Sequence, residues 1–158
     1  MISITSHEII LKKYLNPDNN PDSGSQLYFL GTTRNNNFGK QVTYLEYETF
    51  EEMALTKLNE ISEYAIGKWK LNQLDIIHRI GRVNISEISL LIITSSAHRK
   101  ESFAAIEYVV DELKKVVPIW KKEFYLDGSA WIGSADNPNW NVRQFCIQIL
   151  LWFKSLIW

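Results

Sequence analysis

The stretch "HRKESFAAIEYVVDELKKVVPIWKKEFYL", residues 98–126, decides the fold of this chain. Apolar residues recur in its first part at intervals of three and four, which predicts an amphipathic helix over 98–117. Pro118 ends that helix, and residues 119–126 have the composition of a strand. A long helix followed at once by a strand is therefore the frame on which the rest of the chain is placed.

The patterns upstream of this stretch predict a mixed architecture without regular alternation of strands and helices. Apolar or alternating runs bounded by turn residues predict strands at 26–31, 42–48, 74–81 and 87–96. Apolar residues at helical intervals predict a further helix over 51–66. We expect an α+β fold in which mixed sheets carry the long helix packed on them.

The length and composition predict one globular domain, which we place at residues 1–140. The remaining segment, residues 141–158, is apolar at helical spacing, so a packed amphipathic helix is expected there. Its apolar run is shorter than the roughly 20 residues of a membrane span. A helix on a membrane surface and an unordered tail are the alternatives.

The charge balance argues against a large electrostatic partner. The formal net charge is -1, so no overall field attracts the chain to nucleic acid or to anionic lipid. We expect neither nucleic acid nor a membrane as partner. Any anion-binding site must be a local cluster of basic side chains.

Cysteine and histidine are too few for the commonest metal sites. Cys146 is the sole cysteine, which excludes an intramolecular disulfide and fits a reducing compartment. The three histidines lie far apart without metal-ligand spacing, so we expect no metal and no cofactor. The N-terminal residues lack the pattern of a secretory signal, and a cytoplasmic protein is expected.

His98 and Arg99 stand where the long helix is predicted to begin. Free backbone N–H groups and the positive end of the helix dipole favour an anion at such a place. An imidazole and a guanidinium at this place predict a phosphate-binding site. A solvated helix start without a ligand is the alternative interpretation.

Arg34 follows Thr32 and Thr33 at the end of the first predicted strand. A loop at a strand end that combines small hydroxylated residues with an arginine is a frequent place for anion binding. The pattern is short, and a plain exposed arginine remains the alternative.

Strand parity separates the charged residues after Pro118. Alternation places Lys121 and Glu123 on one face of the strand, with Lys122 on the other face. Lys114, at the end of the preceding helix, could approach Lys121 and form a site with acid-base or nucleophilic chemistry. The alternative is that lysines at a helix end complement the dipole and remain in water.

Recognisable nucleophile and phosphate motifs are missing from the sequence. No glycine-rich phosphate loop and no serine nucleophile elbow occur, and Cys146 lies outside every cluster described above. The reactive group is therefore expected to come from a substrate or a partner.

Four motifs in order and spacing resemble the large, catalytic subunit of molybdopterin synthase. The resemblance runs from about residue 26 to 131, and the motifs are "FLGTTRNNNFGK", "IIHRIGRV", "SSAHRKESFAA" and "VPIWKKEFY". It implies an α/β-hammerhead-like fold that dimerises.

The resemblance also implies an activity and partners. A small ubiquitin-like sulfur carrier, whose C-terminal Gly-Gly bears a thiocarboxylate, would donate sulfur to cyclic pyranopterin monophosphate. Two transfers would form the dithiolene of molybdopterin, in the biosynthesis of the molybdenum cofactor. The expected assembly is a homodimer that binds two carriers as a heterotetramer.

Residue roles follow from the matched motifs. The resemblance implies that Lys114 and Lys121 are catalytic. It implies substrate-binding roles for the other matched residues: Thr32, Thr33, Arg34, His98, Arg99, Lys122 and Glu123. Lys122 and Glu123 would complete the pocket wall, and Glu123 is a candidate for orienting Lys121 or relaying a proton.

Two departures from the family pattern stand out. Family members often carry a basic residue just after the tryptophan that matches Trp131, whereas no cation follows here before Arg143. The apolar tail after Trp140 has no counterpart in the resemblance. A phosphate contact of the family is therefore absent or replaced.

Helix geometry restricts how the site can be assembled. His98 and Lys114 are 16 residues apart on one predicted helix, which separates them by roughly 24 Å. If both serve one substrate, we expect the pocket to combine His98 and Arg99 of one subunit with Lys114 and Lys121 of its twin.

Two other functions remain as alternatives. The chain could be a non-catalytic module that docks a ubiquitin-like protein, or a generic binder of phosphorylated heterocycles. Substitution of Lys121 distinguishes the docking module from the sulfurtransferase. In the sulfurtransferase, carrier binding would survive the substitution while dithiolene formation would collapse.

Overall fold

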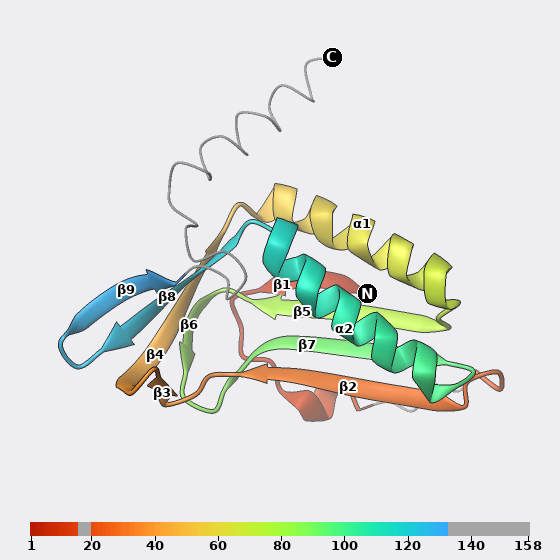
Figure 1. Ribbon diagram of the computed structural model, residues 1–158, viewed down its shortest axis with the longest axis horizontal. Coiled ribbons are helices and arrows are strands. Elements are labelled where there is room, and N and C mark those ends of the chain that lie inside the picture. Colours follow the sequence, from red (N-terminus) through yellow and green to blue (C-terminus); the bar gives the residue numbers. More distant parts are fainter. Residues whose placement is uncertain (16–19, 133–158) are drawn as a thin grey trace, which may run out of the picture.

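The computed structural model describes residues 1–15 and 20–132, with the elements labelled in Figure 1. The helical elements are α1 (Glu51–Trp69), α2 (Arg99–Val116) and a short 3₁₀ turn, η1 (Leu11–Lys13). The strands are β1 (Ile2–Thr5), β2 (Ser25–Thr32), β3 (Asn36–Asn37), β4 (Lys40–Thr49), β5 (Gln73–Arg79), β6 (Gly81–Asn84), β7 (Ile88–Ser96), β8 (Ile119–Tyr125) and β9 (Gly128–Ile132).

The strands form two sheets. The first has the order β1-β5-β7-β2, with β1 parallel to β5 and the remaining pairs antiparallel. The second has the order β3-β4-β8-β9, and β6 adds to it by pairing with β4. The predicted α+β class with mixed sheets is confirmed.

Both helices pack on one face of the first sheet and lie side by side (Figure 1). Ala54, Leu58, Ile61 and Ala65 in α1, and Ala105 and Val109 in α2, are buried at intervals of three and four residues. This spacing brings them to one side of each helix, as the sequence predicts. Removing these side chains from water is the main force that holds the helices to the sheet.

A second apolar cluster covers the opposite face of the first sheet. Ile77, Leu91 and Ile93 form a second cluster with Ile9, and Tyr14 packs against it. The central strand β7 therefore has apolar contacts on both faces, which explains why its sequence reads as a continuous apolar run.

The junction between α2 and β8 fixes where the second sheet begins. Val117 is extended, with φ -84° and ψ 126°, as expected of a residue that precedes proline. Thr49, at the end of β4, donates its hydroxyl to the Pro118 carbonyl at 2.8 Å. The helix thus passes into β8 through two residues, and β8 starts directly beside the end of β4.

Several short strands were not predicted from the sequence. The strand expected over 74–81 ends at Arg79, and Gly81, with φ 73°, turns the chain so that β6 pairs with β4. The strands β1, β3 and β9 were likewise missed. The helix predicted over 141–158 lies outside the described residues.

Candidate functional site

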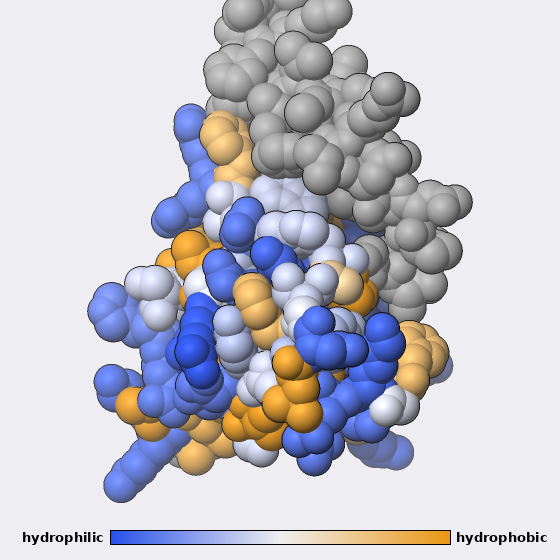
Figure 2. All heavy atoms as spheres, turned by 90° about the vertical axis from the view of Figure 1, so that its left-hand side faces the viewer, coloured by the Kyte–Doolittle hydropathy of each residue, from blue (hydrophilic) through white to orange (hydrophobic). Residues whose placement is uncertain are grey.

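A small pocket lies where the second sheet meets the end of β2. Its volume is about 120 Å³, and its lining residues come from β2, β3, β4, β8 and the loop after β2: Thr32, Arg34, Asn36, Asn37, Val42, Leu45, Tyr47, Lys121 and Glu123. Figure 2 looks onto this end of the molecule, where hydrophilic residues are interspersed with hydrophobic ones. The pocket is smaller than the roughly 300–1,000 Å³ of typical ligand sites.

Lys121 and Glu123 form the charged wall of the pocket. Lys121 pairs in register with Tyr47 of β4, and Glu123 pairs with Leu45, so all four side chains share one face of the sheet. Lys121 Nζ lies 3.2 Å from Glu123 Oε1. The parity predicted for these two residues is the parity that the structure shows.

Glu123 is held by further donors. Glu123 is only 3% exposed, and its Oε2 accepts hydrogen bonds from Asn37 Nδ2 at 2.8 Å and from the Tyr125 hydroxyl at 2.9 Å. A buried carboxylate is costly unless it is paired and hydrogen-bonded. Burial, followed by the bond to Glu123, raises the pKa of Tyr125, so this phenol stays a donor at neutral pH.

Lys122 lies on the opposite face of β8. Its ammonium sits 5.1 Å from the Phe124 ring centroid and 5.3 Å from that of Trp131, on the neighbouring strand β9. These cation–π contacts hold the Lys122 ammonium on the face of the sheet opposite Lys121. The structure therefore does not place Lys122 in the pocket wall, because neighbouring residues of a strand point to opposite faces.

The loop after β2 brings two of its three expected residues to the pocket. Thr32 and Arg34 line it. Thr33 is 3% exposed, and its backbone is tied to the neighbouring loop through the Glu87 carbonyl and the Ser86 N–H. Thr33 thus anchors the loop, while Arg34 supplies the positive charge.

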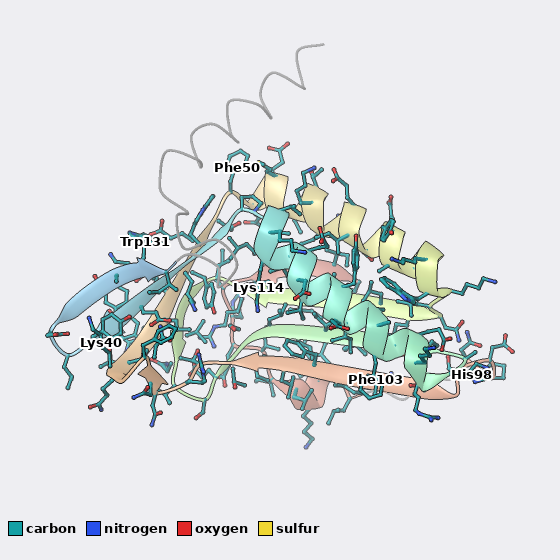
Figure 3. The ribbon with its side chains drawn as sticks, in the orientation of Figure 1. Lys40, Phe50, His98, Phe103, Lys114 and Trp131 are labelled. Carbon is teal, nitrogen blue, oxygen red and sulfur yellow. The ribbon has the colours of Figure 1, made fainter. Side chains whose placement is uncertain are left out.

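His98, Arg99 and Lys114 do not join this pocket within one chain. His98 is the N-cap residue of α2 and Lys114 lies in its last turn, so Figure 3 shows them toward opposite ends of the helix. All three are exposed. Lys114 also stands where a cation complements the helix dipole.

The turn that carries His98 and Arg99 is built from buried hydroxyls. Ser96 Oγ donates to the His98 carbonyl at 2.7 Å, and it lies 2.6 Å from Ser102 Oγ. Since the Ser96 proton is used, Ser102 donates to Ser96. Gly24 packs against the same turn, where an added Cβ would lie 2.4 Å from the Ala97 carbonyl oxygen.

Behind the pocket, Tyr47 packs edge-on against His78 with ring centroids 5.2 Å apart. Burial lowers the pKa of His78 to about 4, against a smaller opposing effect of its hydrogen bond to the Arg79 carbonyl. His78 is therefore a neutral core residue. Burial also raises the pKa of Tyr47, opposed by its hydrogen bond to Ser89 and reinforced by Glu123.

Sequence reasoning missed Asn37, Leu45, Tyr47 and Tyr125. The first lies in a loop that reads only as polar turn residues, and its partner Glu123 is 86 positions away. Tyr47 could have been found by parity, because it alternates with Leu45 in the predicted strand 42–48.

Within residues 1–15 and 20–132, no cluster of three or more His, Cys, Asp or Glu side chains could hold a metal ion. The same described part of the chain contains no helix that is long and apolar enough to cross a membrane.

The fold and this pocket define an α+β protein with a cationic, carboxylate-braced site and no cysteine nucleophile among its lining residues. The model of the family "MoaE protein" matches residues 4–116. The chain belongs to the MoaE protein family.

Curated relatives and a solved structure agree with this family. The molybdopterin synthase catalytic subunit of Dictyostelium discoideum is 42% identical over 144 residues, which covers 89% of this chain and 91% of that protein. The human catalytic subunit is 44% identical over 116 residues, or 73% of this chain and 62% of that protein. The crystal structure of molybdopterin synthase from Staphylococcus aureus has 40% identity and a TM-score of 0.77, covering 82% of this chain and 95% of that chain.

Proposed function

We propose that this chain transfers sulfur from the C-terminal thiocarboxylate of a small ubiquitin-like carrier to cyclic pyranopterin monophosphate. As a MoaE family member it is a molybdopterin synthase catalytic subunit, a sulfurtransferase of molybdenum cofactor biosynthesis. The observation that carries the detailed proposal is the pocket, in which Lys121 is braced by Glu123 and faces the loop of Arg34.

The pocket residues suit a reaction between two anions. A thiocarboxylate and a phosphate must be brought together, and their mutual repulsion is reduced by Lys121 and Arg34 at the pocket wall. Each transfer delivers one sulfur atom to the pterin, and water hydrolyses the carrier acyl group, which breaks its C–S bond and leaves the carrier tail as a carboxylate. One dithiolene therefore consumes two loaded carriers. No protein nucleophile is needed, because the carrier supplies the sulfur.

The complete site is proposed to need two copies of the chain. One chain collects Lys121, Glu123, Arg34 and Thr32, and its pocket of about 120 Å³ is small for a phosphorylated pterin. His98 and Arg99 stand at the far end of α2, roughly 24 Å from Lys114. A symmetric homodimer can bring the His98–Arg99 turn of one copy to the Lys114–Lys121 side of the other.

Thr33 and Lys122 have indirect parts in this proposal. Thr33 holds the Arg34 loop through its backbone bonds. Lys122, on the outer face of the sheet, stands beside Trp131 and is available to the carrier rather than to the pterin. With a carrier bound to each copy, the proposed assembly is a heterotetramer, and one cysteine in the whole chain fits a reducing cytoplasm.

Reconstitution tests the proposal against its two rivals. The chain is mixed with cyclic pyranopterin monophosphate and the carrier, prepared either with a thiocarboxylate or with an ordinary carboxylate terminus. We expect molybdopterin only with the thiocarboxylate. A docking module would bind both carriers and form no product, and a generic heterocycle binder would bind the pterin equally well without any carrier.

A further inference from the structure

The hydrogen bonds around Glu123 divide its two carboxylate oxygens between different tasks. Oε1 contacts Lys121 Nζ at 3.2 Å, whereas Oε2 accepts from Asn37 and from Tyr125. The Glu123 side chain is 5% exposed and that of Lys121 is 34% exposed. The carboxylate is thus an inner anchor, and the ammonium group is the member of the pair that reaches solvent.

The orientation of the Asn37 amide follows from chemistry. An ionised carboxylate only accepts hydrogen bonds, so the amide nitrogen and not its oxygen must face Glu123. The 2.8 Å distance between Asn37 Nδ2 and Glu123 Oε2 is that of a charge-assisted bond. Such a bond fixes the orientation of the Glu123 carboxylate as well as its position.

Asn37 differs from the other two partners of Glu123 in where it comes from. Lys121 and Tyr125 stand two residues before and after Glu123 on β8, so they move with it. Asn37 belongs to β3, which continues from the loop of Arg34. It is therefore the contact that ties the Lys121–Glu123 pair to the Arg34 side of the pocket.

A tight hairpin delivers Asn37 to this place. Asn37 pairs with Lys40 across a two-residue turn in which Phe38 has φ 48° and Gly39 has φ 80°. The Gly39 N–H donates to Asn36 Oδ1 at 3.1 Å. Two successive residues with positive φ are typical of tight hairpin turns, which hold the strand ends in one register.

We propose that Asn37 is a positioning residue of the sulfur-transfer site: it holds Oε2 of Glu123 so that Oε1 directs Lys121 toward the anions bound beside Arg34. This inference rests on the proposed function. Asn37 itself does not touch the reacting atoms in this scheme, and it acts through Glu123.

Asn37→Ala tests the proposal in the reconstituted reaction with thiocarboxylated carrier and cyclic pyranopterin monophosphate. We expect the rate at saturating substrate to fall about tenfold, the effect of losing one hydrogen bond to a charged group, with the KM for the pterin changed by less than about twofold. Asn59→Ala is the matched control, because Asn59 is exposed on α1 and its side chain donates to the Leu55 carbonyl of the same helix. It should keep the wild-type rate.

A double-mutant cycle with Glu123→Gln separates positioning from general stability. If Asn37 acts through Glu123, Asn37→Ala should lower the rate of the Glu123→Gln enzyme by less than about twofold. Should Asn37→Ala fold poorly, Asn37→Asp serves instead: it sets two carboxylates together, and adding Glu123→Gln should restore part of the lost rate.

Two results would overturn the proposal. One is a wild-type rate in both Asn37→Ala and Asn37→Asp, and the other is an Asn37→Ala loss of equal size with and without Glu123→Gln. Failure of the proposed function is distinguishable, because the wild-type chain itself would then form no molybdopterin, or Lys121→Ala would keep the full rate.

Discussion

Lys121 Nζ and Glu123 Oε1 lie 3.2 Å apart on the same face of β8, with the carboxylate buried and the ammonium group partly exposed. An ion pair of this kind contributes little net stability, since desolvation offsets much of the attraction. Its value is geometric, because a flexible lysine is held at one place in the pocket. Glu123 keeps Asn37 and Tyr125 as donors even when Lys121 is removed, so Lys121 can be substituted without leaving a bare buried charge.

A mixture of two inactive variants tests whether each site spans two subunits. Arg99→Ala and Lys121→Ala should each abolish nearly all activity as homodimers. If one site draws Arg99 from one copy and Lys121 from the other, a mixed dimer has one intact site and one doubly altered site. Random mixing of equal amounts should then recover about a quarter of the wild-type rate.

The control for this experiment is each variant unmixed under the same conditions. Molybdopterin formation is measured after the subunits have been co-expressed. A mixture that stays as inactive as its components would contradict the two-subunit site.

Gly24→Ala tests the turn that carries His98 and Arg99. Its Cβ would lie 2.4 Å from the Ala97 carbonyl oxygen, so the backbone of that turn must move. We expect a destabilisation of about 1–3 kcal/mol and a several-fold higher KM for the pterin, because the proposed anion site at His98 and Arg99 is displaced. Urea denaturation and steady-state kinetics measure the two effects.

Gly67→Ala is the matched control for that substitution. Gly67 lies in α1, and a Cβ there would meet no atom of the described residues within 4 Å apart from the nearby helix backbone. Alanine favours a helix over glycine, so stability should rise by about 0.5–1 kcal/mol while the KM stays unchanged. Equal effects of the two substitutions would show that the contact with Ala97 is unimportant.

His78 makes stability depend on pH. Its pKa in the folded chain is about 4, below the ordinary value of 6.5, so the unfolded chain binds the extra proton between these values. The contribution of neutral His78 to the free energy of unfolding is therefore fully present above pH 6.5. It falls as the pH drops toward 4, by at most about 3 kcal/mol at 1.36 kcal/mol per pH unit. His78→Gln should flatten this part of the curve, as measured by urea denaturation from pH 4 to 7. An unchanged slope would show that other groups carry the acid sensitivity.

The periodicity of the sequence alone predicts much of the fold. The helix and strand within residues 98–126, and the shared face of Lys121 and Glu123, depend on local patterns of 3.6 and two residues, which a sequence displays directly. The buried face of α1 is predicted for the same reason.

The parts that sequence did not reveal depend on long-range pairing. The two-residue strand β3 exists because it folds back on β4, and Asn37 finds Glu123 only after β4 and β8 have paired. Likewise β6 is separated from β5 by a single residue, so the two read as one strand until Gly81 turns the chain. Such contacts have no local pattern that would mark them.

Single-turnover molybdopterin formation by Lys121→Ala tests the central claim most directly. The chain and its thiocarboxylated carrier are supplied in excess over cyclic pyranopterin monophosphate. Carrier affinity is measured in parallel, and Lys57→Ala on α1 serves as control. We predict that Lys121→Ala binds the carrier with nearly the wild-type Kd and forms product at least about 100-fold more slowly, the scale of losing one preorganised charge, whereas Lys57→Ala matches wild type. Product formation by Lys121→Ala at the wild-type rate would contradict the account.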